Sequence, residues 1–134
     1  MKKFLILGGI FLLLALVIII SITRTKKDSE EIKIGAVLPL TGNSAKYGES
    51  IKRGIDIALA EINEEGGIKG LKVQIIYEDS KALPNEGVSA FKKIIKTHKV
   101  LAVIGDAVSS VTLAIAPIAE KNKIVVLSPL SSAP

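Results

Sequence analysis

Residue types that carry chemistry are missing or scarce in this 134-residue sequence, which has no cysteine and a single histidine. The absence of cysteine excludes disulfide bonds, thiolate metal sites, cysteine nucleophiles and a lipid-modified cysteine. Three catalytic or nucleotide-binding motifs are also absent: Gly-x-Ser-x-Gly, Gly-Lys-Ser/Thr and His-Glu-x-x-His. His98 stands beside lysines at a predicted helix end, where a cation suits the helix dipole. We therefore predict no active site, no metal and no cofactor.

Most of the chain carries no net positive charge. The formal net charge of +5 comes from the five basic residues that precede Asp28: Lys2, Lys3, Arg24, Lys26 and Lys27. The remainder carries 13 basic and 13 acidic side chains. It also lacks the basic stretch interleaved with aromatic residues that is typical of nucleic-acid binding. The sequence therefore predicts no nucleic-acid partner.

One long hydrophobic run divides the chain into an N-terminal segment, residues 1–30, and a globular part, residues 31–134. Residues 4–22 carry no charge, and a helix of that length rises about 28 Å, close to the roughly 30 Å of a bilayer core. A cleavable signal peptide has a shorter apolar core, of about 7 to 15 residues, and a small-x-small cleavage site, which residues 21–24 do not offer. We expect an uncleaved membrane anchor, with a cleaved signal peptide as the alternative.

Short apolar runs alternate with helical periodicity from residue 31 onward. The pattern predicts strands at residues 32–38, 71–77, 100–105 and 124–127, and helices at residues 47–63, from Pro84 onward and at residues 110–121. This βαβαβαβ order with short connections predicts a parallel sheet between two layers of helices, a three-layer α/β fold. About 105 residues can build a single lobe. The chain ends in a loop that should lead into further structure, so we expect an N-terminal fragment.

Ligands of such sheets bind beyond the carboxyl ends of the strands, and two hydroxyl-rich loops are predicted there. Ser109 and Ser110 begin the third helix, where backbone amides and the helix dipole favour an anion such as a carboxylate. The alternative is that one of these serines simply caps its helix. Residues 128–132 form the second loop. Together the two loops favour a site for a small polar ligand.

The adjacent carboxylates of Glu78 and Asp79 are the other candidate for chemistry. They could form a metal or acid–base pair, but adjacent residues at the end of a strand point to opposite faces of the sheet. We therefore interpret them as a solvated strand end.

Four stretches together resemble the beginning of a known family: residues 32–70, 73–95, 100–110 and 124–134. The most specific parts are PLTG after the first strand, INEEGGIKG after the first helix, and the Ser-Pro loop at the end. In this order and at these separations, they resemble the branched-chain amino-acid (Leu/Ile/Val-type) binding proteins. These are the extracytoplasmic, type I periplasmic solute receptors of ABC importers.

This resemblance implies two α/β lobes that close on a ligand, of which this chain holds most of the first and none of the second. It implies that Ser109 and its neighbour Ser110, together with Ser132, hold the ligand's head group. A backbone contact falls on Leu130, where small residues are common in the family, and Tyr47 covers the ligand's side chain. The acidic residue that grips the ligand's ammonium group belongs to the second lobe.

The function implied by the resemblance is capture of a branched-chain or similar amino acid for an ABC permease and its ATPase, without chemistry. The globular part is then outside the cytoplasm. The positive-inside rule opposes this orientation, because three basic residues follow the hydrophobic run and two precede it. Two alternatives remain: the ligand-sensing ectodomain of a membrane signalling receptor, and a flavodoxin-like enzyme, for which no cofactor loop is found.

Overall fold

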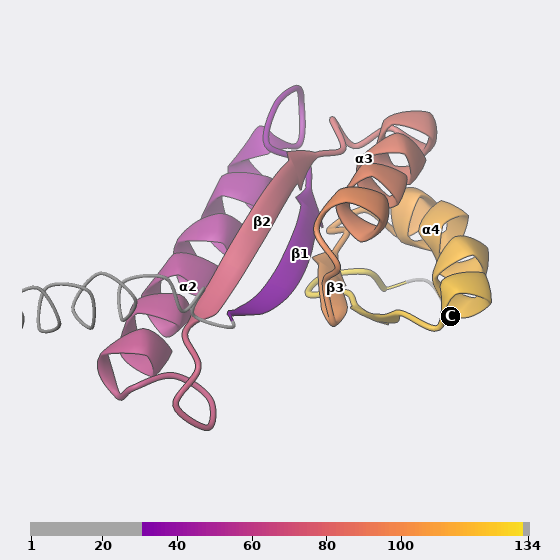
Figure 1. Cartoon of the computed structure of the whole chain (residues 1–134). Coiled ribbons are helices and arrows are strands. Elements are labelled where there is room, and N and C mark those ends of the chain that lie inside the picture. The colour runs from indigo at the N-terminus through magenta and orange to yellow at the C-terminus, as the bar shows by residue number, and fades with distance from the viewer. Residues whose placement is uncertain (1–30, 133–134) are drawn as a thin grey trace, which may run out of the picture.

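Four strands and three helices alternate along residues 31–132, the part of the chain that the computed structural model describes (Figure 1). They are β1 (Ile32–Leu38), α2 (Ala45–Glu64), β2 (Val73–Asp79), α3 (Pro84–Thr97), β3 (Ala102–Gly105), α4 (Ser109–Asn122) and β4 (Val125–Leu127). The predicted order of elements is confirmed. Within residues 31–132, no helix combines the length and hydrophobicity needed to cross a membrane. The expected anchor, residues 4–22, lies outside the described residues.

Strand β2 differs most from its prediction at residues 71–77. It begins two residues later because Leu71 belongs to a tight turn, in which it forms an isolated bridge with Ile68. Gly67 makes this turn possible, since its φ is +81° and a Cβ atom there would lie 2.0 Å from the Leu71 carbonyl oxygen. The strand also continues to Asp79, which pairs with Leu38 of β1. Glu78 and Asp79, which lie beyond the predicted end of the strand at residue 77, therefore belong to the sheet.

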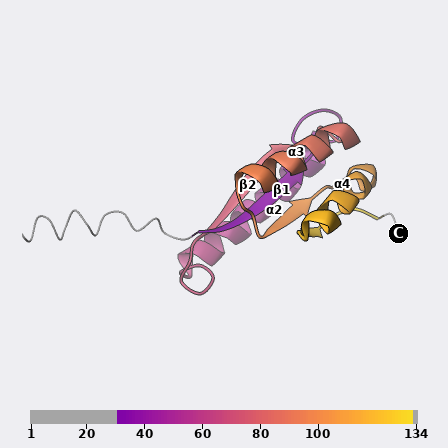
Figure 2. The ribbon, with the colours of Figure 1, turned by 45° about the vertical axis from the view of Figure 1, so that its right-hand side comes forward.

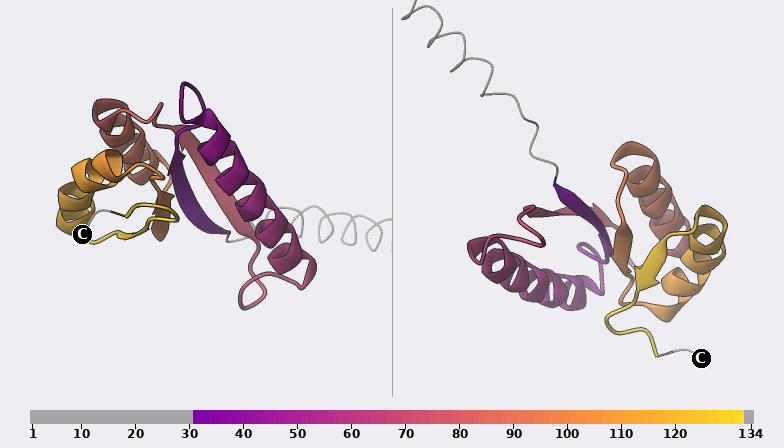
Figure 3. Two further views of the ribbon diagram at one scale, coloured as in Figure 1. Left: turned by 180° about the vertical axis from the view of Figure 1, so that it is seen from behind. Right: turned by 60° about the horizontal axis from the view of Figure 1, so that its bottom comes forward.

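All four strands are parallel and lie in the order β2-β1-β3-β4. Helix α2 covers one face of the sheet, and α3 and α4 lie together on the other (Figure 3). This arrangement confirms the predicted parallel α/β fold. Because the strands are parallel, their carboxyl ends meet at one edge, and the loops after them share that edge.

The core lies between the sheet and the α3–α4 layer. It is formed by Phe91 and Ile94 of α3, Val111 and Ile115 of α4, and Val37 of β1, all fully buried. The spacing of Val88, Phe91 and Ile95 predicts that all three are buried by this helix. Phe91 is buried, whereas Val88 and Ile95 are only partly buried. These contacts make α3, α4 and the centre of the sheet one packed unit.

Polar contacts attach α2 to the opposite face. The Tyr77 hydroxyl of β2 donates to the Asp56 carboxylate (2.6 Å), which also pairs with Lys52 (2.6 Å). The Asn63 side chain both accepts from the Val73 amide and donates to the Val73 carbonyl, at 2.8 Å each. Specific hydrogen bonds therefore hold this helix at its middle and at its end.

The α2 side of β4 is uncovered within the described residues. Val126 packs against the core, so the alternation of a strand points Val125 and Leu127 to the other face. Their side chains are 68% and 67% exposed. An apolar strip beside an unpaired strand edge is a surface that favours association.

Candidate functional site

The loops at the carboxyl edge of the sheet are joined by hydrogen bonds between residues far apart in sequence. Residues 39–44 follow β1, residues 80–83 follow β2, residues 106–108 follow β3 and residues 128–132 follow β4. Two buried or half-buried carboxylates, Asp79 and Asp106, organise these loops. Neither residue was among the site residues expected from the sequence.

Asp79 joins the first loop to the end of β2. Its carboxylate accepts hydrogen bonds from the Leu40 amide (2.8 Å), the Thr41 amide (3.3 Å), the Thr41 hydroxyl (2.5 Å) and the Lys81 amide (2.8 Å). Burial acts to raise the pKa of Asp79, but the Thr41 hydroxyl and the three amides outweigh it and lower the pKa below its ordinary value. The interpretation of Asp79 as part of a solvated strand end is wrong, because this carboxylate fixes the first loop.

Glu78 points away from Asp79, as the strand alternation predicts. Its carboxylate pairs with Lys93 of α3 at 2.7 Å. The two carboxylates therefore do not form a joint site. In the described part of the chain, no group of three metal-ligating side chains is close enough to hold a metal ion.

Asp106 is the buried polar centre of this edge. Its side chain is 0% exposed, and its Oδ1 accepts from the Val108 amide at 2.8 Å. Its Oδ2 is buried without a hydrogen-bond partner among residues 31–132. Burial raises the pKa of Asp106, against the smaller opposing effects of the Ser80 hydroxyl and the Val108 and Ala107 amides. This carboxyl therefore tends toward its neutral form beneath the start of α4.

The backbone of Asp106 links the two serine-rich loops. Its carbonyl oxygen accepts from the Ser128 hydroxyl at 2.7 Å, and Ser128 Oγ in turn accepts from the Ser131 amide at 2.9 Å. The Thr112 hydroxyl of α4 donates to the same carbonyl (3.2 Å) and accepts from the Asp106 amide (3.1 Å). The loop after β4 is thus fastened to the start of α4.

Two of the expected ligand-binding residues come together as a result. The Ser132 amide donates to Ser109 Oγ at 3.3 Å, across 23 positions of sequence. Ser109 is half-buried and Ser132 is exposed. A polar group placed here would meet hydroxyl groups from both loops.

Neither Ser109 nor Ser110 caps α4, so the capping alternative is wrong. The cap residue is Val108, and α4 has no side-chain cap hydrogen bond. The loop is instead tightened by Asp106 Oδ1, which takes the Val108 amide. Among residues 31–132, the Ser110 amide at the exposed helix end has no hydrogen-bond partner. This end of α4 keeps a donor for an anion.

Leu130 and Tyr47, the two other residues expected to bind the ligand, are exposed. Among the described residues, no hydrogen bond joins either of them to Ser109 or Ser132. Leu130, in the loop after β4, is 52% exposed, and Tyr47, in the first turn of α2, is 61% exposed. The position of Tyr47 depends on Gly48, whose added Cβ atom would lie 2.1 Å from the Pro39 carbonyl oxygen. That close approach sets the first turn of α2 against the first loop.

Comparison with known proteins agrees with the fold. The sequence profile of the periplasmic binding protein family matches residues 31–134. The Leu/Ile/Val-binding protein BraC3 of Rhizobium johnstonii is 36% identical over 104 residues, which cover 78% of this chain and 28% of that protein. The chain thus spans less than a third of the length of this relative.

Solved structures give the same result. The substrate-binding protein LivJ of a branched-chain amino acid transporter from Streptococcus pneumoniae, solved with isoleucine, has a TM-score of 0.75 and 33% identity. The match covers 78% of this chain and 30% of LivJ. An ABC transporter solute-binding protein from R. palustris, solved with benzoate, has a TM-score of 0.68 and 28% identity, over 77% of this chain and 28% of that one. The resemblance to the branched-chain amino-acid binding proteins is confirmed, and this chain belongs to the periplasmic binding protein family.

Proposed function

We propose that residues 31–134 are the first lobe of an extracytoplasmic solute-binding protein, which captures a branched-chain or related amino acid for an ABC importer. In this proposal residues 1–30 anchor the lobe to the membrane, and a second lobe closes over the ligand. The protein binds its ligand without catalysis and delivers it to a permease driven by an ATPase. The relatives that match this chain are solute-binding proteins, which supports a role in binding.

The observation that carries the proposal is the contact of the Ser132 amide with Ser109 Oγ at the start of α4. This contact brings the Ser132 backbone to the Ser109 hydroxyl, next to the Ser110 amide at the same helix N-terminus. A ligand carboxylate suits this environment, because its charge is stabilised by backbone donors and by the helix dipole. Isoleucine and benzoate, found in two of the matching structures, share a carboxylate and no other charged group.

The exposed side chains near this rim suit the rest of the ligand. Leu130 and Tyr47 offer apolar surface that a bound aliphatic side chain would cover. We therefore expect the aliphatic amino acids valine, leucine and isoleucine to bind.

Site-directed substitution in the whole protein, with both lobes, tests the head-group assignment. Ser109→Ala removes a charge-assisted hydrogen bond to the carboxylate, of about 1.5 to 3 kcal/mol, which corresponds to a roughly ten- to hundredfold loss in affinity. Ser132→Ala acts similarly, and the two losses are non-additive because both groups hold one head group. Calorimetric titration with valine, leucine, isoleucine and benzoate measures these affinities.

Ser44→Ala is the matched control, since Ser44 precedes α2 and makes no side-chain cap hydrogen bond. Its affinity should equal that of the unsubstituted protein. Unchanged affinity in Ser109→Ala, together with a lower melting temperature, would show that Ser109 serves the fold and not the ligand.

Fractionation tests the anchor separately. Because residues 4–22 carry no charge, we expect the protein to stay in the membrane during alkaline carbonate extraction, with its globular part accessible to protease from outside the cytoplasm. Release into the soluble fraction, with a new N-terminus near Thr25, would show that the segment is cleaved.

A further inference from the structure

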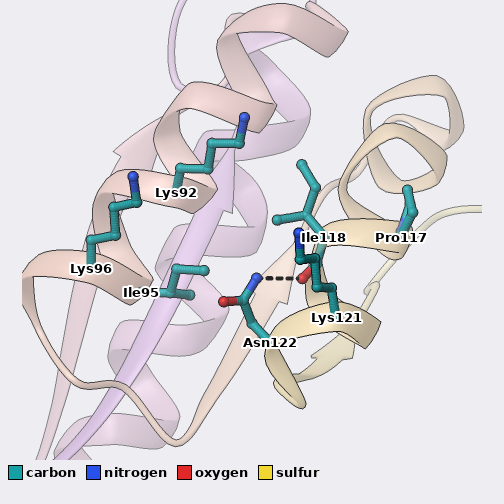
Figure 4. A pocket seen from close by; sticks show the side chains of 7 residues that line it. All are labelled: Lys92, Ile95, Lys96, Pro117, Ile118, Lys121 and Asn122. Carbon is teal, nitrogen blue, oxygen red and sulfur yellow. Dashed lines mark hydrogen bonds between the residues drawn. The ribbon is translucent and has the colours of Figure 1, made fainter.

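A second concave surface lies away from the serine loops, between the outer faces of α3 and α4 (Figure 4). It is a groove of about 430 Å³, with Lys92, Lys96 and Lys121 at its sides and Ile95, Pro117 and Ile118 among its apolar lining. Ile95 and Ile118 also pack against the core. The groove is therefore a fixed feature of the helix pair, with an apolar base and cationic sides.

The three ammonium groups of this groove are not neutralised by any of the described residues. None of Lys92, Lys96 and Lys121 has an ion-pair partner in residues 31–132, whereas the neighbouring Lys93 pairs with Glu78. No carboxylate lines the groove. Three cations that share a concave surface attract an anion.

The groove lies toward the end of the molecule at which β1 begins. In a parallel sheet each connecting helix runs back from the carboxyl edge to the amino edge, and in Figure 2 both α3 and α4 end toward the start of β1. Lys96 and Lys121 lie in the last turns of these helices. The groove therefore lies nearer the amino edge of the sheet, whereas the proposed ligand site is at the carboxyl edge.

Further basic charge lies near the groove. Lys99 and Lys123, which follow α3 and α4, are exposed at the same edge. The end of α2 and the turn after it carry both signs of charge: Glu61, Glu64 and Glu65 are exposed, and so are Lys69 and Lys72. The α3–α4 side therefore presents the larger group of lysines to a negative surface.

We propose that this groove binds the phosphate groups of anionic lipids in the membrane that holds the chain. The inference rests on the proposed anchor, residues 4–22. Only residues 23–31 separate that run from β1, and nine residues reach at most about 30 Å. The membrane surface is therefore near this edge, and its lipid phosphates are the anions that the anchor brings closest to the groove. Lysine side chains can extend toward phosphates while their methylene stems and the isoleucines cover the first apolar groups of the lipid.

In this bound state, the α3–α4 side of the lobe contacts the membrane, and the two serine-rich loops point away from the bilayer. The proposed ligand site then stays open to the surrounding solution. In this arrangement, binding of anionic lipid sets the orientation of the solute-binding lobe on the membrane.

Lysine footprinting of the full chain in nanodiscs tests this proposal. The chain is placed in phosphatidylcholine discs with or without phosphatidylglycerol, and acetylation of each lysine is followed by mass spectrometry. We expect severalfold slower acetylation of Lys92, Lys96 and Lys121 in the presence of phosphatidylglycerol. High salt should restore the rate, because it screens charge. Lys46 and Lys81, at the carboxyl edge, are the internal controls and should react equally in both discs.

A variant pair shows whether the groove is the cause. Lys99 and Lys123, exposed at the same edge as the groove, should also be protected by phosphatidylglycerol. Substituting Lys92, Lys96 and Lys121 by Gln should abolish that protection. Substituting Lys46, Arg53 and Lys81 by Gln removes the same charge away from this edge and should preserve that protection.

Two results in the discs would overturn the proposal. One is equal acetylation of the groove lysines in both kinds of disc. The other is protection in phosphatidylcholine alone that grows with the number of chains per disc, which would assign the groove to a second copy. A chain that leaves the discs refutes the anchor and leaves the groove to be tested separately. The released chain is then sedimented with phosphatidylglycerol vesicles, where salt-sensitive binding supports the groove and absence of binding refutes it.

Discussion

Replacing Asp106 by Asn should stabilise the protein at neutral pH. The side chain is 0% exposed, and its Oδ2 has no hydrogen-bond partner among the described residues. Asn keeps the shape and the Oδ1 acceptor that the Val108 amide uses. It also replaces an unpaired, ionisable oxygen by an amide group that can donate to the Ser80 hydroxyl.

The magnitude follows from the cost of leaving a buried polar group unpaired, about 1 to 3 kcal/mol and more for a charged one. For a domain of about 100 residues, each kcal/mol changes the melting temperature by roughly 4 to 8 °C. We therefore expect Asp106→Asn to melt at least several degrees above the unsubstituted chain near neutral pH.

Asp106→Asn should also remove a dependence of folding stability on pH. Burial raises the pKa of Asp106 in the folded state, so the folded protein binds this proton more tightly than the unfolded chain does. Stability is then greatest below the unfolded pKa of about 3.9 and falls as pH rises through the folded pKa. The advantage of the Asn variant should thus be largest at neutral pH and shrink as pH approaches about 4.

Thermal melts by circular dichroism, on the full chain in one detergent at a series of pH values, measure this difference. Asp79→Asn is the control, for which we expect the opposite change in melting temperature. Burial acts to raise the pKa of Asp79, but the Thr41 hydroxyl and three amides lower it overall. The ionised Asp79 carboxylate therefore stabilises the folded protein at neutral pH, and this contribution is lost below about pH 3.9. Asp79→Asn should thus lower the melting temperature at neutral pH. An Asp106→Asn variant that is less stable at neutral pH, or equally affected at every pH, would refute the reasoning.

Two other predictions concern packing. Gly48→Ala should destabilise the protein by about 1 to 3 kcal/mol, because the new methyl group would lie 2.1 Å from the Pro39 carbonyl oxygen. Gly54→Ala in the same helix meets nothing within 4 Å and should stabilise it by roughly 0.5 to 1 kcal/mol; equal melting temperatures would contradict both. Residues 31–134 expressed alone should self-associate through the uncovered face of β4, as measured by analytical ultracentrifugation. A monomer with a sharp cooperative melt would disprove this.

The order of strands and helices could be predicted from the sequence because it depends on local spacing. Apolar residues three and four positions apart define α2, α3 and α4, and continuous apolar runs define β1 and β3. The end of β2 could not be predicted in this way. Glu78 and Asp79 are polar, and they belong to the strand because Val37 and Leu38 pair with them across the sheet.

The candidate site could likewise be predicted only in part from the sequence. The rule that ligands bind at the carboxyl edge of a parallel sheet was enough to place Ser109 and residues 128–132 on one rim. The sequence also presents Asp106 directly after an apolar strand, but a carboxylate at that position is ordinarily a solvated loop residue. Its burial, its unpaired oxygen and its carbonyl contact with Ser128 depend on how the loops after β3 and β4 pack together.

The sequence by itself thus determined the order of the elements and the edge of the sheet that carries the candidate site, because both follow from periodicity and chain direction. Only the tertiary structure decided that Ser132 reaches Ser109, that Asp79 fixes the first loop and that three lysines share one groove. Each of these depends on side chains from separate elements meeting in space. The spacing of residues along one element does not specify such meetings.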